Sequence, residues 1–159
     1  IIICLPKDSE KAFEEMKKAS VEILKGLKIP FRIIKICSGD LGDLKYEQVD
    51  FEVYSPRRKT YIESGSCSNL TTAQARKLGI STIVKGERIV PHTLNNTAMA
   101  TPRPLIAILE NNQQKDGSVK IPSVLWKYMN GKKVLEAKKS TTIKEVKKVK
   151  AINKASKKK

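Results

Sequence analysis

Glu63-Ser-Gly-Ser-Cys-Ser-Asn69 sets one carboxylate, three serine hydroxyls and a glycine along a short run of strand-like sequence. Upstream of it, residues 50–54 alternate apolar and polar side chains as a half-buried strand does, and Pro56-Arg-Arg-Lys59 is typical of a hairpin tip. The chain is therefore predicted to return through residues 60–66 as the second strand of a hairpin.

A second segment, His92-Thr-Leu-Asn-Asn-Thr97, is followed by Thr101-Pro-Arg-Pro104, where an arginine enters the first turn of an apolar helix. A carboxylate with hydroxyls suits a metal ion bound to phosphates, and an arginine at a helix start suits the phosphates themselves. Together the two segments predict a nucleotide site that uses neither a Walker loop nor a Rossmann turn.

Hydrophobic periodicity predicts the remaining elements of the fold. Helices are expected from Asp8 or Ser9 to Gly26, over 71–78 and over 101–114, the last capped by Thr101 and buried. Strands are expected at 1–5, 31–37, 50–54, 60–66, 80–84 and 88–94, and 121–128 closes the domain. Because adjacent hairpins dominate, the fold class is α+β, an antiparallel sheet flanked by helices.

Charge divides the chain into two parts. Of the formal charge of +16, residues 136–159 carry +8 from ten lysines and two glutamates. We predict one folded domain over 1–131 and a lysine-rich, disordered tail over 132–159. Two interpretations of the tail stay open: an idle solvated extension, and sequence-blind contact with RNA phosphates.

Several classes of protein are excluded by composition. A transmembrane helix needs about 18 consecutive apolar residues, and no apolar run in the sequence is that long, so no membrane partner is expected. Three separated cysteines without a CxxC pair and a single histidine argue against a disulfide framework and a zinc site, and favour a reducing cytoplasm. The abrupt strand at Ile1 suggests a piece of a longer protein.

Seven motifs then occur in the same order as in seryl-tRNA synthetases, and the resemblance covers roughly residues 3–131. They are Cys37-Ser-Gly-Asp-Leu-Gly42, Tyr61-Ile-Glu-Ser-Gly-Ser-Cys-Ser-Asn69, Gln74-Ala-Arg76, His92-Thr-Leu-Asn-Asn-Thr97, Thr101-Pro-Arg103, Ile108-Leu-Glu-Asn111, and Asp116-Gly-Ser118 with Ile121-Pro122. The resemblance implies part of a class II aminoacyl-tRNA synthetase catalytic domain, which activates L-serine with ATP and Mg²⁺ and passes it to tRNA(Ser).

The resemblance also implies a cytoplasmic homodimer when the protein is full-length. By this comparison the chain begins just after the second signature motif of the family. It then lacks the N-terminal tRNA-binding arm, the dimer-forming first motif and the second motif with its α-phosphate arginine. We therefore expect the isolated chain to be inactive.

Phosphate and metal contacts are assigned by the resemblance to a few residues. Glu63 and Ser66 hold Mg²⁺, and with Ser64 and Gly65 they contact ATP. Their alternatives are an ordinary ion pair for Glu63, a turn serine for Ser66 and a β-bulge at Gly65. Arg103 contacts the γ-phosphate, and Glu63 and Arg103 count as catalytic.

Elementary chemistry supports the assignment of Arg103. Pro102 and Pro104 remove two free N–H donors from the helix start, so a guanidinium must do more of the phosphate binding. The alternative is a surface arginine, although the helix dipole disfavours a cation there.

Recognition of the amino acid is assigned by the resemblance to Thr97, and Asn95 either contacts serine or shapes the turn. The alternative for Thr97 is a bond to its own backbone. His92 is expected to be a packed strand-end histidine, because the serine carboxylate needs no base. Asp50 and Glu52 are expected on a solvated or ion-paired face, and Cys67 is expected to be buried.

A rival interpretation is a non-catalytic basic RNA-binding protein derived from a synthetase and driven by the lysine tail. Retention of Glu63, Ser66, Thr97 and Arg103 together argues against decay of the site. Absence of the upstream motifs argues against activity of this chain alone.

In the full-length protein, removal of residues 136–159 is expected to weaken tRNA binding, most strongly at low salt, and to leave serine activation intact. The segment carries half the net charge and none of the matched motifs. Its loss should flatten the slope of log affinity against log salt, because fewer counterions are released. Filter binding across a salt series measures this, and superimposable curves with and without the segment would show an idle extension.

Overall fold

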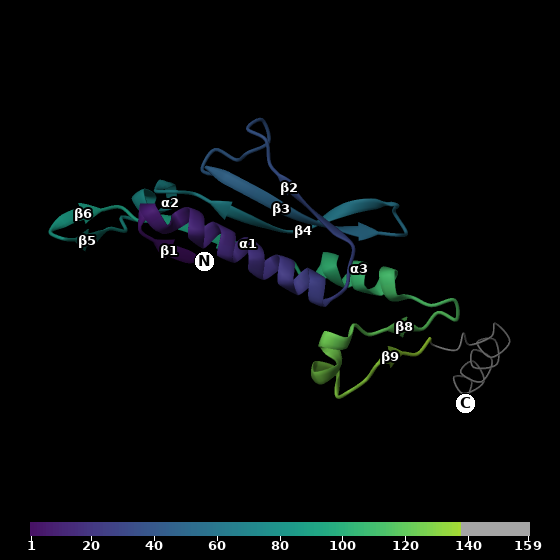
Figure 1. The fold of residues 1–159 in the computed structure, drawn as a ribbon. Helices are drawn as coiled ribbons and strands as arrows, with labels where there is room; N and C mark the ends of the chain where they lie inside the picture. The colour runs from purple at the N-terminus through teal and green to yellow at the C-terminus, as the bar shows by residue number, and fades with distance from the viewer. Residues whose placement is uncertain (138–159) are drawn as a thin grey trace, which may run out of the picture.

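A computed structural model of the chain describes residues 1–137. In them, five strands form one antiparallel sheet in the order β1-β7-β4-β3-β2 (Figure 1). These strands are β1 (Ile2–Cys4), β2 (Phe31–Lys35), β3 (Glu47–Ser55), β4 (Thr60–Asn69) and β7 (His92–Asn96). The predicted antiparallel sheet with flanking helices is confirmed, and the lysine tail beyond residue 137 lies outside the described residues.

The β3–β4 hairpin is the longest pairing in the described part and runs from Glu47 opposite Asn69 to Ser55 opposite Thr60. Both strands extend past their predicted ends at 50–54 and 60–66. Apolar alternation fades before the strands do, but cross-strand hydrogen bonds continue wherever two backbones stay aligned. The extension makes all of Glu63–Asn69 part of the sheet.

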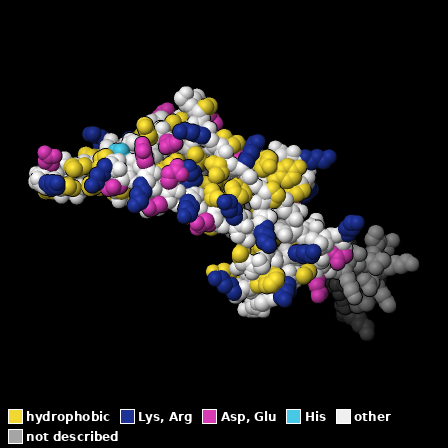
Figure 2. All heavy atoms as spheres, viewed as in Figure 1, with side chains coloured by type: hydrophobic (Ala, Val, Ile, Leu, Met, Phe, Trp, Pro, Cys, Tyr) yellow, Lys and Arg dark blue, Asp and Glu magenta, His cyan; other side chains and the backbone are white. Residues whose placement is uncertain are grey.

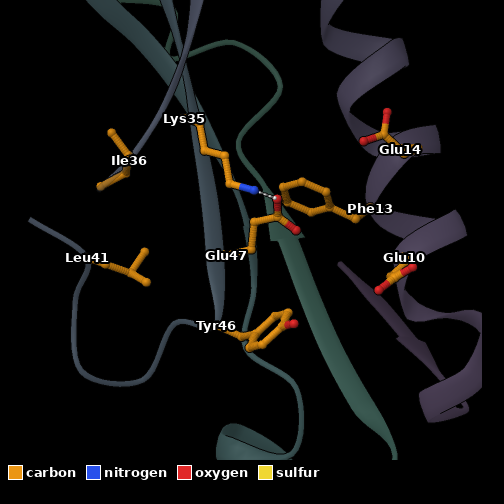
Figure 3. A pocket seen from close by; sticks show the side chains of 8 residues that line it. All are labelled: Glu10, Phe13, Glu14, Lys35, Ile36, Leu41, Tyr46 and Glu47. Carbon is orange, nitrogen blue, oxygen red and sulfur yellow. Dashed lines mark ion pairs between the residues drawn. The ribbon is translucent and has the colours of Figure 1, made fainter. Parts of the chain in front are cut away.

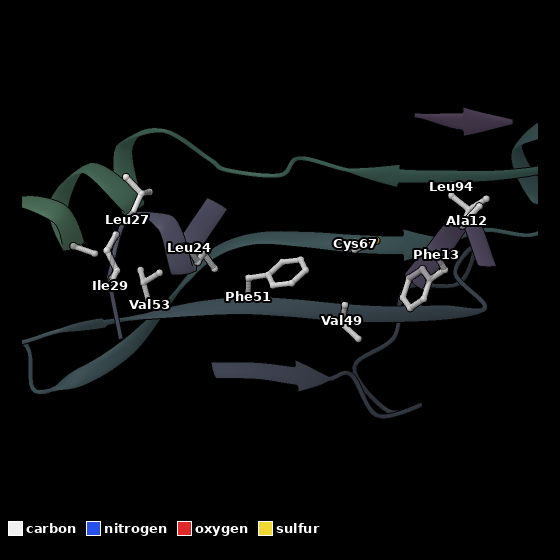
Figure 4. Packing of buried hydrophobic residues seen from close by; sticks show 11 residues of the cluster. Ala12, Phe13, Leu24, Leu27, Ile29, Val49, Phe51, Val53, Cys67 and Leu94 are labelled. Atoms are coloured by element: carbon white, nitrogen blue, oxygen red, sulfur yellow. The ribbon is translucent and has the colours of Figure 1, made fainter. Parts of the chain in front are cut away.

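Helix α1 (Ser9–Gly26) covers one face of the sheet and forms the core with it (Figures 1 and 4). Phe13 and Leu24 of this helix pack with Phe51, which is fully buried in β3. Helix α3 (Pro102–Asn112) adds Ala107 to the same cluster. No helix within residues 1–137 is both long enough and apolar enough to cross a membrane.

The burial of Cys67 is confirmed, because its side chain lies wholly within this core. Burial raises the pKa of the Cys67 thiol to about 11. A thiol with that pKa stays protonated at neutral pH, so it packs as a small apolar group.

A β-bulge in β4 decides which side chains share the other face. Glu63 and Ser66 are three residues apart, and in a regular strand they would lie on opposite faces. Here Glu63 pairs with Glu52 while Gly65 pairs with Phe51, which leaves Ser64 as the extra residue. The bulge therefore brings Glu63 and Ser66 onto the same face, opposite α1.

The bulge is held by a buried hydrogen bond. The Ser64 hydroxyl donates to the Phe51 carbonyl at 2.9 Å, and Ser64 is only 1% exposed. The β-bulge that we considered at Gly65, as the alternative to a contact with ATP, therefore exists but is centred on Ser64. A Cβ on Gly65 would lie 3.5 Å from the Ala98 carbonyl oxygen, which is an ordinary van der Waals distance. The backbone that approaches Gly65 is therefore the segment at Ala98 of the same chain.

The predicted strand 88–94 was wrong, because two strands occupy that region. β6 (Glu87–Ile89) pairs with β5 (Thr82–Val84) in a small separate sheet that projects from one end (Figure 1), and β7 joins the main sheet. Pro91 lies between β6 and β7. Proline has no N–H to give to a ladder, so the chain leaves one sheet before it enters the other.

Helix α3 was expected to be buried, and this was also wrong. It buries Pro104 and Ala107, while Leu105 and Ile106 are 49% and 39% exposed. A helix on a sheet buries only the stripe that faces the sheet. Thr101 precedes the helix but makes no side-chain capping bond.

The helix α2 (Ala73–Lys77) is shorter than its predicted range. A short 3₁₀ helix, η1 (Pro6–Asp8), precedes α1. At the C-terminal end of the described chain, three short elements form a small lobe: β8 (Val119–Lys120), the 3₁₀ helix η2 (Ser123–Met129) and β9 (Val134–Leu135). β9 pairs with β8, so ordered structure continues past the predicted boundary at residue 131.

Substitution Ser64→Ala is expected to destabilise the fold by about 1–3 kcal/mol, because the buried Phe51 carbonyl loses the Ser64 donor. Ser66→Ala is the matched control, since its half-buried side chain lies on the open face, and it should change the free energy of unfolding by less than about 0.5 kcal/mol. Urea unfolding followed by circular dichroism measures both. Equal losses for the two variants would contradict a structural role for Ser64.

Candidate active site

The predicted site residues gather on the face of the sheet opposite α1. Ser66 lies opposite Asp50 in the β3–β4 pair, and Asn95 lies opposite Ser68 in the β4–β7 pair. Ser66 and Ser68 are two residues apart on a regular part of β4, so their side chains point to the same side. With the bulge, this face holds Glu63, Ser66 and Asn95 together.

The segment after β7 continues along the free edge of β4 and brings Thr97 to the same place. β7 pairs with β4 only as far as Asn96 opposite Cys67. Beyond that point, the Thr97 N–H donates to the Ser66 carbonyl at 3.3 Å, and the Ala100 N–H donates to the Ser64 carbonyl at 2.8 Å. Thr97 is therefore held beside Ser66, and its side chain is exposed.

Arg103 closes this edge by contacting Glu63. Its Nη1 lies 3.0 Å from Glu63 Oε2 and 3.1 Å from the Glu63 carbonyl oxygen. The ion pair that was the alternative for Glu63 is thus present, and its partner is the other predicted catalytic residue. Both side chains are about half exposed, 53% for Arg103 and 44% for Glu63. Such an exposed pair stabilises little, so an anionic ligand can exchange for the carboxylate.

Asn95 was predicted either to contact serine or to shape the turn, and the neighbouring Asn96 is the residue that shapes the turn. The Asn96 amide donates to the Ser20 hydroxyl on α1 at 2.8 Å, and its side-chain oxygen accepts from the Ala98 N–H at 2.8 Å. Asn96 therefore shapes the turn and ties it to α1. Asn95 faces the other side of the sheet, with Glu63 and Ser66.

Ser64 and Gly65 sit differently from the residues around them. Both are buried in the bulge, and the Ser64 hydroxyl is already bonded. They support the site by placing Glu63 and Ser66. The Ser64 hydroxyl is not free to bind a ligand on the open face, and Gly65 has no side chain.

Arg32, which was not among the predicted site residues, adds a second guanidinium to this face. Its Nε lies 2.5 Å from Glu52 Oε2, and its guanidinium carbon lies 4.5 Å from the centroid of the Tyr61 ring. The alternation of β2 does turn Arg32 away from the core, but its partners are 20 or more residues away along the chain. The predicted ion-paired state of Glu52 is confirmed.

His92 is a packed residue, as predicted. Its Nδ1 lies 2.9 Å from the hydroxyl of Ser9 at the start of α1, and burial lowers the pKa of the imidazole below its usual range. Asp50 accepts a hydrogen bond from the Gln48 amide at 2.6 Å. His92 is thus bound to α1, on the face away from the predicted site.

The oxygen donors present suit Mg²⁺ held jointly with a nucleotide. Within residues 1–137, no three His, Cys, Asp or Glu side chains gather closely enough to hold a metal by themselves. Glu63 and Ser66 instead offer a carboxylate and a hydroxyl on one accessible face. Mg²⁺ prefers such hard ligands and takes one or two from the protein and the rest from phosphates and water.

A separate hollow of about 530 Å³ lies between α1 and the ends of β2 and β3 (Figure 3). Its lining includes Glu10, Phe13 and Tyr46, and the Lys35–Glu47 ion pair of 2.8 Å crosses it. None of the predicted site residues lines it. The predicted site is an open face of the sheet instead.

Comparison with known proteins supports the resemblance seen in the motifs. A serine–tRNA ligase of Methanospirillum hungatei is 47% identical over 137 residues, which are 84% of this chain and 32% of that protein. A serine–tRNA ligase of Dictyoglomus thermophilum is 48% identical over 129 residues, 80% of this chain and 30% of that protein. The chain therefore spans about a third of the length of these relatives.

Solved structures give the same result. Seryl-tRNA synthetase from Pyrococcus horikoshii complexed with ATP matches with a TM-score of 0.82 and 39% identity, over 86% of this chain and 31% of that one. Cytoplasmic serine–tRNA ligase from Naegleria fowleri in complex with AMP matches with a TM-score of 0.79 and 37% identity, over 86% of this chain and 33% of that one.

The match to a protein family covers most of the chain. Residues 1–112 match the family described as tRNA synthetase class II core domain (G, H, P, S and T). These residues include the whole main sheet, α1 and α3, and every predicted site residue. The chain belongs to the class II tRNA synthetase core-domain family.

Proposed function

We propose that the protein containing these residues is a serine–tRNA ligase, which activates L-serine with ATP to seryl-adenylate and transfers the seryl group to tRNA(Ser). The observation that carries the proposal is the convergence of Glu63, Ser66 and Asn95 on one open face, with the Thr97 backbone bonded to Ser66 and Arg103 in contact with Glu63 at the edge of that face. The names of the relatives and the ATP and AMP bound by the solved structures support it.

In the proposed reaction the serine carboxylate attacks the α-phosphorus of ATP, and pyrophosphate leaves. The carboxylate is already an anion at neutral pH, so this step needs no general base. Catalysis is then mainly the positioning of two anions and the neutralisation of their charge. The α-phosphate arginine and the serine-binding glutamate of the family lie outside the matched motifs of this chain.

Arg103 and Glu63 are proposed to exchange partners when ATP binds. Without a ligand the guanidinium is paired with Glu63 at 3.0 Å. A γ-phosphate offers the guanidinium a more highly charged, fork-compatible partner. Glu63 would then be free to hold Mg²⁺ together with Ser66, and the metal would supply positive charge against the phosphates. The pair keeps each charge compensated both before and after binding.

Thr97 is proposed to select serine. Its backbone N–H donates to the Ser66 carbonyl, and its side chain is exposed. A hydroxyl that pairs with the substrate hydroxyl disfavours alanine, because alanine leaves that group without a partner.

Two further features of the family are proposed here from the resemblance, namely a homodimeric and cytoplasmic full-length protein. A non-catalytic RNA-binding role is the rival proposal. The placement of Glu63, Ser66 and Asn95 on one face, with Thr97 and Arg103 bonded to it, favours the ligase, because a decaying site has no need to keep these residues together.

Arg103→Ala is expected to lower serine-dependent ATP–pyrophosphate exchange by about 30- to 1000-fold, since a phosphate contact of this kind is worth about 2–4 kcal/mol in a transition state. The test uses this chain joined to the N-terminal two-thirds of the Pyrococcus horikoshii enzyme. Arg103→Lys should restore activity only partly, because lysine lacks the planar fork.

Arg88→Ala on β6 is the matched control and should leave exchange unchanged, and the 159-residue chain alone should give none. An exchange rate for Arg103→Ala within threefold of the unsubstituted chimera would show that Arg103 does not bind the phosphate.

Thr97→Val keeps the shape of the side chain and removes its hydroxyl. In the same chimera it should lower the preference for serine over alanine by about tenfold, the effect of losing one hydrogen bond worth about 1.4 kcal/mol. The ratio of kcat/KM for the two amino acids in the exchange assay measures this. An unchanged ratio would assign the selection to another residue.

A further inference from the structure

The lobe formed by residues 119–135 combines aromatic rings with lysines in a way that serine activation does not use. This stretch carries Lys120, Lys127, Lys132 and Lys133 and has no aspartate or glutamate. It also holds Trp126 and Tyr128 in the 3₁₀ helix η2. Figure 2 shows hydrophobic and basic side chains lying together over this lobe.

Hydrogen bonds to backbone carbonyls hold the lobe in a defined shape. The chain turns back after η2 through Asn130 and Gly131, which both have positive φ, and the Gly131 N–H donates to the Trp126 carbonyl at 2.8 Å. The Trp126 indole N–H donates to the Ile121 carbonyl at 2.8 Å, and the Ile121 N–H donates to the Lys133 carbonyl at 2.8 Å. The rings and lysines are therefore presented on a preorganised frame, which lowers the entropy cost of binding.

Each of the two rings has a lysine ammonium over one of its faces. Lys127 Nζ lies 4.8 Å from the centroid of Tyr128, and Lys133 Nζ lies 4.9 Å from the centroid of Trp126. Tyr128 is 73% exposed, so most of its ring is accessible. A nucleotide has the complementary chemistry, because its base stacks on an aromatic ring while its phosphate pairs with an ammonium.

We propose that the lobe of residues 119–135 is a docking surface for single-stranded RNA, with a base stacked on Tyr128 and phosphates paired with Lys127 and Lys133. Stacking needs an unpaired base, so a single strand fits the surface better than a duplex. The inference rests on the proposed function only in choosing RNA as the polyanion.

The only tryptophan of the chain, Trp126, lies inside this lobe and reports on it directly. Titration of the full chain with a 12-nucleotide single-stranded oligouridylate at low salt should quench Trp126 fluorescence to saturation. Tyr128→Ala should weaken binding about 5- to 150-fold, the effect of losing one stacked base, and Tyr128→Phe should retain it. Lys127→Gln with Lys133→Gln should reduce the slope of log affinity against log salt by about 1.4.

Matched controls lie elsewhere on the surface. Tyr46 is similarly exposed, at 66%, and Tyr46→Ala should leave binding unchanged. Lys7→Gln with Lys77→Gln, two exposed lysines outside the lobe, should leave the quenching of Trp126 unchanged. These variants separate the lobe from the general positive charge of the chain.

Several outcomes would overturn the proposal. RNA retained on a filter without any change in Trp126 emission would place binding elsewhere, and a Tyr128→Ala loss no larger than that of Tyr46→Ala would exclude stacking. Equally tight binding of a duplex of the same length would also exclude stacking of an unpaired base on Tyr128. A Trp126 response to anionic lipid vesicles but not to RNA would assign the surface to membranes. None of these measurements depends on serine activation, so the two proposals succeed or fail separately.

Discussion

The β-bulge at Ser64 is the constraint on which the proposed site depends. It costs one pairing position in β4, and the buried hydrogen bond from Ser64 to the Phe51 carbonyl compensates for it. Phe51 is also a fully buried residue of the core beneath α1. The same point of the sheet therefore anchors the core on one face and turns Glu63 toward Ser66 on the other.

The free edge of β4 is the second determinant, because β7 ends before it reaches the bulge. The segment from Thr97 to Arg103 takes over that edge through two backbone hydrogen bonds and one guanidinium contact. A single short connection thus delivers both the residue proposed to select serine and the residue proposed to hold phosphate. The exposed Arg103–Glu63 pair keeps both charges compensated while leaving them accessible to a ligand.

Prediction from the sequence succeeded where the signal was local. The amphipathic pattern of α1, the hairpin tip at 56–59 and the fold class follow from periodicity and turn chemistry, and the ordered motifs identify the family. Prediction failed where neighbours decide the outcome. The break at Pro91 separates two sheets, α3 leaves Leu105 exposed, and β9 extends the fold past residue 131, and each depends on what packs or pairs at that place.

The sequence by itself determined which chemical groups this protein has: a carboxylate and hydroxyls in Glu63–Asn69, an arginine between two prolines, and lysines concentrated toward the C-terminus. Only the tertiary structure decided which of them meet. In a regular strand, the odd spacing of Glu63 and Ser66 would put their side chains on opposite faces. Arg103 lies 40 residues along the chain from its partner Glu63. The sequence offers Asn95 and Asn96 as equal candidates, and the pairing of β7 with β4 puts them on opposite faces of the sheet. Residue spacing describes one strand or helix, whereas a bulge, a register and a strand edge arise only when separate strands pair.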